Sequence, residues 1–398
     1  MLSFAVLFAF AAAVFAQSAD AISPDLALLA KIRSRVIWNL HRLPDYTCVE
    51  TVERDHRRSA SHRFELLDTI RLEVALVDGR EMFGWPGAKS FEDMDARRLI
   101  SRGAFSNGNF ANHARAIFAG GFTRFTYKGE AMLGDGAAAR FDYEIPQFGS
   151  SYLLSAGGRQ ATVGYHGSIY ADPKTFDVQR IEVIADEIPA GLGLARAMDR
   201  MDYARVPIGE GDFLLPRESE LTMSDVDGAE NRNRVRLASC RQFTGQSTLT
   251  FREAALQEAA PLSEVDLPRD ISLEFRLASD IDTHTAAVGD PVRAVLETDI
   301  KQRGQILFQK GARVLGRITR LERGDGEVLV GLDFFSIESA GERAPLKLQL
   351  EDVAGGEFLN PSPRRAVPAA RPGEGIIPLG PGHFRLNRGI LMFWRTEF

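Results

Sequence analysis

The stretch that decides the fold is residues 165–181, which reads YHGSIYADPKTFDVQRI. Two runs of strand-forming residues, Gln160 to Tyr170 and Phe176 to Ala185, flank the link from Ala171 to Thr175. That link predicts a turn, because proline fixes φ and the side chain of Asp172 can hydrogen-bond the backbone that follows it. The pattern therefore predicts two antiparallel strands at the centre of a β domain.

On the N-terminal side, one amphipathic helix precedes the strands. Ser23-Pro24 supplies an N-cap and a proline at the first helical position, and apolar residues then recur at three- and four-residue steps until Pro44. From Tyr46 the period changes to two, and Asp78-Gly79 between two apolar runs indicates a hairpin. Many short strands with few helices predict an all-β domain with helical insertions.

Between Pro86 and Gly121 the alternating pattern stops, and Ser90 and Asn109 each begin a short helical pattern. Helices this short are not stable alone, so their apolar side chains must pack on the sheet. In one interpretation these side chains are ordinary core. In the other they line a ligand cavity under a movable cover, with Leu192 and Leu194 in a second cover. The candidate ligand-binding residues are Phe83, Trp85, Phe91, Met94, Phe110, Phe118, Phe122, Leu192 and Leu194.

A second series of strands follows the acidic, alanine-rich passage at residues 252–268, which we expect to be a linker. Short apolar runs at about ten-residue spacing between Ile271 and Leu350 predict a small barrel or sandwich. Six of the 18 prolines lie in residues 360–381, so we expect an exposed flexible loop there. Residues 384–398 then predict a final buried strand that closes the second barrel.

The N-terminus and the two cysteines indicate in which compartment of the cell the protein is expected to be. Residues 2–15 are almost entirely Leu, Phe, Ala and Val, and the sequence Val14-Phe15-Ala16 predicts a signal peptide at residues 1–16. A buried N-terminal helix is the alternative. In an oxidising compartment Cys48 and Cys240 predict one disulfide, and two buried free thiols are the alternative. The mature chain is expected to contain two domains, at residues 17–251 and 269–398, and to be periplasmic or secreted.

The order of elements at residues 24–250 resembles the half-open β-barrel family of lipoprotein-localisation factors. The resemblance rests on the N-terminal helix, the hairpin Val77-Asp78-Gly79-Arg80-Glu81, the exit Trp85-Pro86, the stretch at 165–181, and Phe213-Leu214-Leu215-Pro216-Arg217-Glu218. It implies a mainly β fold, in which a curved antiparallel sheet is closed by an N-terminal helix and short covering helices over an apolar cavity that holds acyl chains. The second series is similar to small periplasmic barrels, through residues 288–296 and 306–317.

Several function classes have little support. The chain lacks the Gly-x-Ser-x-Gly elbow, the phosphate loop and His-Glu-x-x-His, so no cofactor or metal is predicted. A net charge of -6 argues against nucleic acid as a partner, and no internal apolar run is long enough to span a bilayer. His166 would act as a general base only beside a carboxylate such as Asp172 or Asp186, and a structural histidine is the alternative.

We therefore expect a non-enzymatic periplasmic or secreted protein that binds a lipid, a lipoprotein or another apolar ligand in a half-barrel cavity. The second hypothesis is a structural or interaction module of the cell envelope, which would contact an envelope protein through its C-terminal domain and bind no small molecule. The third is an envelope hydrolase that uses His166.

Overall fold

The structure is a computed structural model that describes residues 23–77, 80–87, 91, 112–156, 158–243, 262–324, 327–339, 341–354, 369–380 and 382–397. The expected signal peptide at residues 1–16 lies outside these ranges, as do the candidate residues Met94 and Phe110. Within the described ranges, no helix combines the length and the apolar character needed to cross a membrane.

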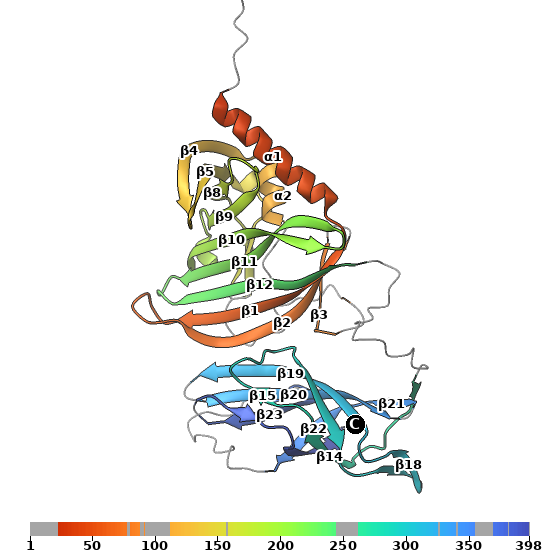
Figure 1. Ribbon diagram of the computed structural model, residues 1–398. Helices are drawn as coiled ribbons and strands as arrows, with labels where there is room; N and C mark the ends of the chain where they lie inside the picture. The colour runs from red at the N-terminus through yellow and green to blue at the C-terminus, as the bar shows by residue number, and fades with distance from the viewer. Residues whose placement is uncertain are drawn as a thin grey trace, which may run out of the picture.

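A ten-stranded antiparallel sheet forms the N-terminal half of the molecule (Figure 1). Its first strand in the sequence, β1, lies beside its last, β12, so the chain enters and leaves the sheet at neighbouring strands. In spatial order the strands are β3 (Arg80–Gly84), β2 (Glu65–Val77), β1 (Tyr46–Arg57), β12 (Glu230–Gln242), β11 (Gly211–Asp225), β10 (Leu194–Ile208), β9 (Val178–Ala185), β8 (Tyr165–Ala171), β5 (Gly136–Ile145) and β4 (Arg124–Leu133).

The turn between β8 and β9 forms as the sequence predicts. The carboxylate of Asp172 accepts hydrogen bonds from the backbone N–H groups of Lys174 and Thr175, at 2.7 and 3.0 Å. A small hairpin of β6 (Leu153–Ala156) and β7 (Arg159–Thr162) precedes β8 and stands apart from the main sheet. The expected strand from Gln160 to Tyr170 is therefore two strands.

Two helices cover the concave face of this sheet. Helix α1 (Pro24–Arg42) crosses it diagonally, and α2 (Asn112–Ala119) lies beneath α1 (Figure 1). Asn39 anchors α1 to β11, because its side-chain amide donates to the carbonyl of Leu214 and accepts from the N–H of Leu214, both at 2.9 Å. The half-open barrel with an N-terminal helix, implied by the sequence resemblance, is confirmed by this arrangement.

The C-terminal half contains a second sheet of nine strands that curls back on itself. Strand β23 pairs with β20 and packs against β22 and β25. Gly375 of β23 is at the point of closest approach, because a Cβ there would lie 2.6 Å from the Cβ of Leu350 on β22. The strands are β13 (Ser263–Glu264), β21 (Glu342–Pro345), β20 (Glu327–Ser339), β19 (Arg313–Gly324), β16 (Pro291–Leu296), β14 (Ser272–Leu277), β25 (Leu391–Thr396), β22 (Leu348–Val353) and β23 (Glu374–Leu379). Two further strand pairs complete this half: β15 (Ile281–Asp282) with β24 (Arg385–Leu386), and β17 (Ile300–Gln302) with β18 (Gln305–Phe308).

Two expectations about the C-terminal half are wrong in part. The segment at residues 360–381 was expected to be a flexible loop, yet its last part is β23, with Ile377 and Leu379 buried. Pro378 is tolerated because, among the described strands, β23 is hydrogen-bonded to β20 alone, so a proline on its other edge interrupts no ladder there. The expected linker at residues 252–268 also contains a short strand, β13, which pairs parallel with β21.

The two sheets meet at the edge of β2. Ile70 forms a parallel bridge with Val288, in which the N–H of Arg71 donates to the carbonyl of Val288 and the N–H of Val288 donates to the carbonyl of Thr69, both at 2.8 Å. The side chains of Arg71 and Asp290 form an ion pair beside this bridge. Figure 1 shows β2 and β19 facing each other across the junction. One cluster of buried apolar side chains, here called the shared core, includes residues of both sheets.

Candidate functional site

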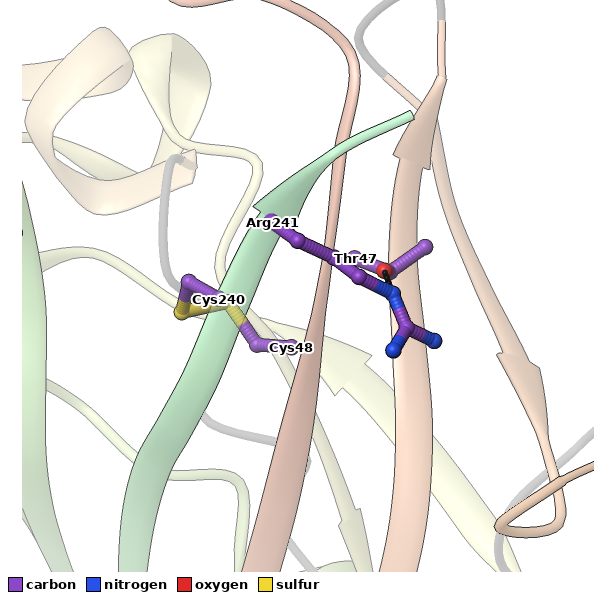
Figure 2. Close-up of a disulfide and its surroundings, with 4 residues drawn as sticks. All are labelled: Thr47, Cys48, Cys240 and Arg241. Carbon is purple, nitrogen blue, oxygen red and sulfur yellow. Dashed lines mark hydrogen bonds between the residues drawn. A yellow bond between two sulfur atoms is a disulfide. The ribbon is translucent and has the colours of Figure 1, made fainter. Parts of the chain in front are cut away.

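The disulfide joins the strands that come first and last in the sequence of the N-terminal sheet, β1 and β12. Figure 2 shows Cys48 of β1 bonded to Cys240 of β12, with an S–S distance of 2.00 Å and a Cα–Cα distance of 4.1 Å. Beside it, the guanidinium of Arg241 donates to the hydroxyl of Thr47 at 3.1 Å. The predicted disulfide is confirmed, and the alternative of two free thiols is wrong.

The candidate ligand-binding residues are divided among several places. Phe118, Leu192 and Leu194 belong to a buried apolar cluster between the two helices and the sheet, here called the inner cluster. Phe83 belongs to the shared core instead, and Trp85 packs against that core.

Two other candidate residues lie outside both clusters. The ring of Phe91 contacts Phe243 edge to face, with ring centroids 6.5 Å apart. Phe122 is 56% exposed and its ring contacts Phe148, with ring centroids 5.5 Å apart. Of the seven candidate residues in the described part of the chain, three, Phe118, Leu192 and Leu194, therefore lie together in the inner cluster.

A small cavity lies under the helices. Its volume is about 20 Å³, and its lining includes Val36 and Leu40 of α1, Phe118 of α2, and Tyr46 and Tyr203 of the sheet. That space holds about one water molecule. An acyl chain could therefore enter this cavity only if α1 or α2 moved.

A row of side chains crosses the concave face and is more polar than the sequence predicts. Arg54 of β1 lies between Asp68 of β2 and Asn233 of β12, and side chains paired across strands share a face. The guanidinium of Arg54 donates to Asp68 at 2.7 Å through Nε and again through Nη2. From β2 to β5 the row contains Asp68, Arg54, Asn233, Leu221, Asp199, Val183, Gly167 and Tyr143.

Asp199, in the middle of this row, faces His113 of α2. Nε2 of His113 lies 3.8 Å from Oδ2 of Asp199, and both side chains are 5% exposed. Burial in apolar surroundings raises the pKa of Asp199 to about 7 and lowers the pKa of His113 to about 4. The ring of His113 also contacts the rings of Tyr152 and Tyr165 edge to face.

Glu50 is a second buried carboxyl group on the concave face, and sequence analysis did not single it out. It is fully buried, and within the described part of the chain neither carboxyl oxygen has a hydrogen-bond partner. Burial, with a smaller contribution from the charge of Glu81, raises its pKa well above the usual value. Its alternation with Cys48 and Val52 was the available signal, because that spacing places all three side chains on one face.

His166 lies on the opposite face, in an open hollow of about 870 Å³ that is lined by β4, β5, β8 and β9. Nδ1 of His166 lies 2.6 Å from a carboxylate oxygen of Asp186, while Asp172 is engaged in its turn. The hydroxyl of Ser168, two residues along the same strand, donates to Asp142 at 2.8 Å. The hollow thus contains a histidine and carboxylate pair, but Ser168 is directed toward another partner.

No family model matches the chain, and no curated protein matches it. Three solved structures are similar in outline. A putative outer membrane lipoprotein-sorting protein domain from Vibrio parahaemolyticus is 11% identical over 55% of this chain and 93% of its own, with a TM-score of 0.30. A LolA superfamily protein from Nitrosomonas europaea is 10% identical over 55% and 93%, with a TM-score of 0.28. A DUF1329 family protein from Desulfovibrio piger is 11% identical over 58% and 98%, with a TM-score of 0.31. Likeness at this level says nothing about function.

Proposed function

We propose that this chain is a non-enzymatic protein of the periplasm or of the secreted fraction that binds an apolar, lipid-like ligand between its helices and the concave face of the N-terminal sheet. One observation carries the proposal. Helix α2 has eight residues and buries Ile117 and Phe118 completely in the inner cluster. A helix of two turns has little stability of its own, so apolar contacts hold it on the sheet. An acyl chain offers the same contacts and can take the place of α2.

Two further features support a location outside the cytoplasm and a role in binding without catalysis. The apolar sequence at residues 2–15, which predicts a signal peptide, and the disulfide both suit an oxidising compartment outside the cytoplasm. The buried face of the sheet combines apolar side chains with a small number of polar groups, such as Asp199 facing His113, which is the usual composition of a small-molecule binding site.

The test compares the bound lipid of three proteins purified from the envelope fraction: wild type, Phe118→Ala and Phe148→Ala. Phe118→Ala removes roughly 100 Å³ of side chain from the inner cluster, whereas Phe148 is exposed on the surface and serves as the matched control. Native mass spectrometry followed by lipid extraction should find an acyl species on the wild type. We expect a higher occupancy on Phe118→Ala and an unchanged occupancy on Phe148→Ala.

The second candidate function is a structural or interaction module, with an envelope protein bound through the C-terminal half. The tight packing under the helices favours it, because the cavity there holds about one water molecule. Wild type and Phe118→Ala that both purify without any acyl species would favour this function over lipid binding. A hydrolase using His166 would instead lose its activity in His166→Ala while lipid occupancy stayed the same.

A further inference from the structure

A pocket of about 410 Å³ lies at the junction of the two sheets. It is separate from the small cavity under the helices, because no residue lines both. Residues 85–87, which follow β3, line it from the N-terminal half, and Leu315, Arg317 and Phe335 of β19 and β20 line it from the C-terminal half. Small-molecule sites often form where two parts of a protein meet, and this volume is typical of them.

Arg317 is held in the pocket by aromatic rings from both halves of the molecule. Its Cζ lies 4.6 Å from the ring centroid of Phe335 and 5.6 Å from the ring centroid of Trp85. Contact with the faces of aromatic rings stabilises a cation and restricts the side chain that carries it. The guanidinium of Arg317 is therefore positioned before any ligand arrives.

The positive charge of Arg317 is incompletely paired. Its Nε is buried and has no hydrogen-bond partner among the described residues. Asp333 lies opposite Arg317 on β20, but its Oδ2 is 3.9 Å from Nε, beyond hydrogen-bond distance. Burial lowers the pKa of Arg317 although Asp333 opposes this shift, and burial raises the pKa of Asp333 although Arg317 opposes that shift. Asp333 is thus a weak partner for the guanidinium.

The other charged side chains of the pocket lining have closer partners. Nη2 of Arg343 lies 3.1 Å from Oε2 of Glu264, and a carboxylate oxygen of Glu338 lies 3.6 Å from Nη2 of Arg313. Among the described residues of the lining, Arg317 is therefore the charged group most available to a ligand. A negatively charged group would complement it, because a guanidinium donates two parallel hydrogen bonds to a planar carboxylate.

We propose that the pocket binds a small molecule with a single carboxylate group on an aromatic or apolar body, and that Arg317 binds the carboxylate. The body of the ligand packs on Trp85, Leu315 and Phe335. The carboxylates of Glu264 and Glu338 in the lining disfavour a second negative charge on the ligand. This site is additional to the proposed lipid site under the helices and does not depend on it.

The test uses four compounds with the same ring system, namely 2-naphthoate, 2-naphthalenemethanol, 2-naphthylmethylammonium and 2-naphthyl phosphate. Ligand-observed NMR titrations with the full-length protein, at a mildly alkaline pH where the phosphate carries two charges, give the dissociation constants. We expect 2-naphthoate to bind about tenfold more tightly than the alcohol, the factor expected for one charged, hydrogen-bonded contact. The phosphate should bind more weakly than 2-naphthoate, and the ammonium compound should be the weakest.

Three variants then test the residue. Arg317→Gln should bring the affinities for 2-naphthoate and the alcohol within about twofold of each other. Arg317→Lys keeps the charge but cannot form the paired hydrogen bonds, so it should retain only part of the preference. Arg293→Gln is the matched control, because Arg293 is an exposed arginine opposite Leu315 on β16 and lies outside the pocket lining; it should behave as wild type.

The outcomes separate this proposal from lipid binding. A wild type that binds none of the four compounds, or that binds 2-naphthoate and the alcohol equally, would overturn the site. A full preference in Arg317→Gln would place the carboxylate elsewhere, and Arg317→Lys decides the same point if Arg317→Gln does not fold. Tighter binding of the phosphate than of 2-naphthoate would overturn the assignment of a singly charged ligand. Occupancy by lipid under the helices should be the same in all these variants.

Discussion

His113 of α2 and Asp199 of β10 face each other where the helix packs on the sheet, and their pKa values are shifted in opposite directions. Folding raises the pKa of Asp199 from 3.8 to about 7 and lowers the pKa of His113 from 6.5 to about 4, in both cases because burial disfavours the charged form. Stability from Asp199 is therefore lost as the pH rises from about 4 to about 7. Stability from His113 is lost as the pH falls from about 6.5 to about 4.

The first prediction is that these opposite contributions nearly cancel in the wild type, so its unfolding free energy is almost independent of this pair between about pH 4 and pH 6.5. In His113→Gln only Asp199 remains, and stability should fall as the pH rises through this window. In Asp199→Asn only His113 remains, and stability should fall as the pH drops. Each slope should approach 1.4 kcal/mol per pH unit, as expected for about one proton. Urea unfolding at several pH values measures the slopes.

The double variant is the internal control, because it lacks both groups and should again show a flat profile. Parallel slopes in the two single variants would contradict the argument. They would mean that the buried environment does not disfavour the two charges as described.

At the level of the element, Gly167 explains how β8 packs between its neighbours. A Cβ at this position would clash with the carbonyl oxygen of Glu182 on β9 and would lie 3.0 Å from the hydroxyl of Tyr143 on β5. That hydroxyl donates to the same carbonyl at 2.8 Å. The glycine thus leaves room for a side chain to bridge three strands.

The second prediction is that Gly167→Ala destabilises the protein by about 3 kcal/mol, because backbone atoms of β9 cannot yield as a flexible side chain would. Thermal unfolding and denaturant titration would both report the loss. Gly121→Ala is the control, because a Cβ there meets nothing within 4 Å, and its effect should stay within about 0.5 kcal/mol. Equal effects of the two variants would show that β9 can shift to accommodate the methyl group.

Elements with a clear local signal could be predicted from the sequence. Helix α1 follows from Ser23-Pro24 and its apolar period, and the turn after β8 follows from Asp172-Pro173. Strand β23 could not be predicted, because its pairing with β20 and its packing on Trp394 override the effect of Pro378. The positions of Phe83 and Phe118 in different clusters also depend on how distant elements pack, which local periodicity does not encode.

At the level of the whole molecule, the shared core and the bridge from Ile70 to Val288 couple the two sheets. Gly289 makes the close approach feasible. It has φ 99°, and a Cβ there would clash with the carbonyl oxygen of Arg71 and lie 2.7 Å from the ring of Trp85. The sequence predicted two domains in tandem, but it contained no sign that residues so far apart would pair.

The third prediction is that the wild type unfolds in a single transition and that Gly289→Ala separates it into two. Scanning calorimetry distinguishes the cases. Gly311→Ala is the matched control, because Gly311 also has a positive φ, 90°, but no neighbour within 4 Å of its Cβ position. It should lower stability by about 1 kcal/mol and keep one transition. Two transitions in the wild type would show that the junction does not couple the sheets.

The disulfide also determines how the chain would respond to tension. Cys48 and Cys240 are 192 positions apart but lie on adjacent strands, so the chain that forms the ten-stranded sheet is closed into a covalent loop. A pull applied between α1 and the second sheet would pass along the few residues before Cys48, cross the sulfur bridge and leave after Cys240. Part of the force would also pass through the bridge from Ile70 to Val288 and the contact of Asn39 with Leu214, and the covalent path would carry the load once these contacts had broken. The protein could therefore be held taut between two attachments while its binding face kept its shape.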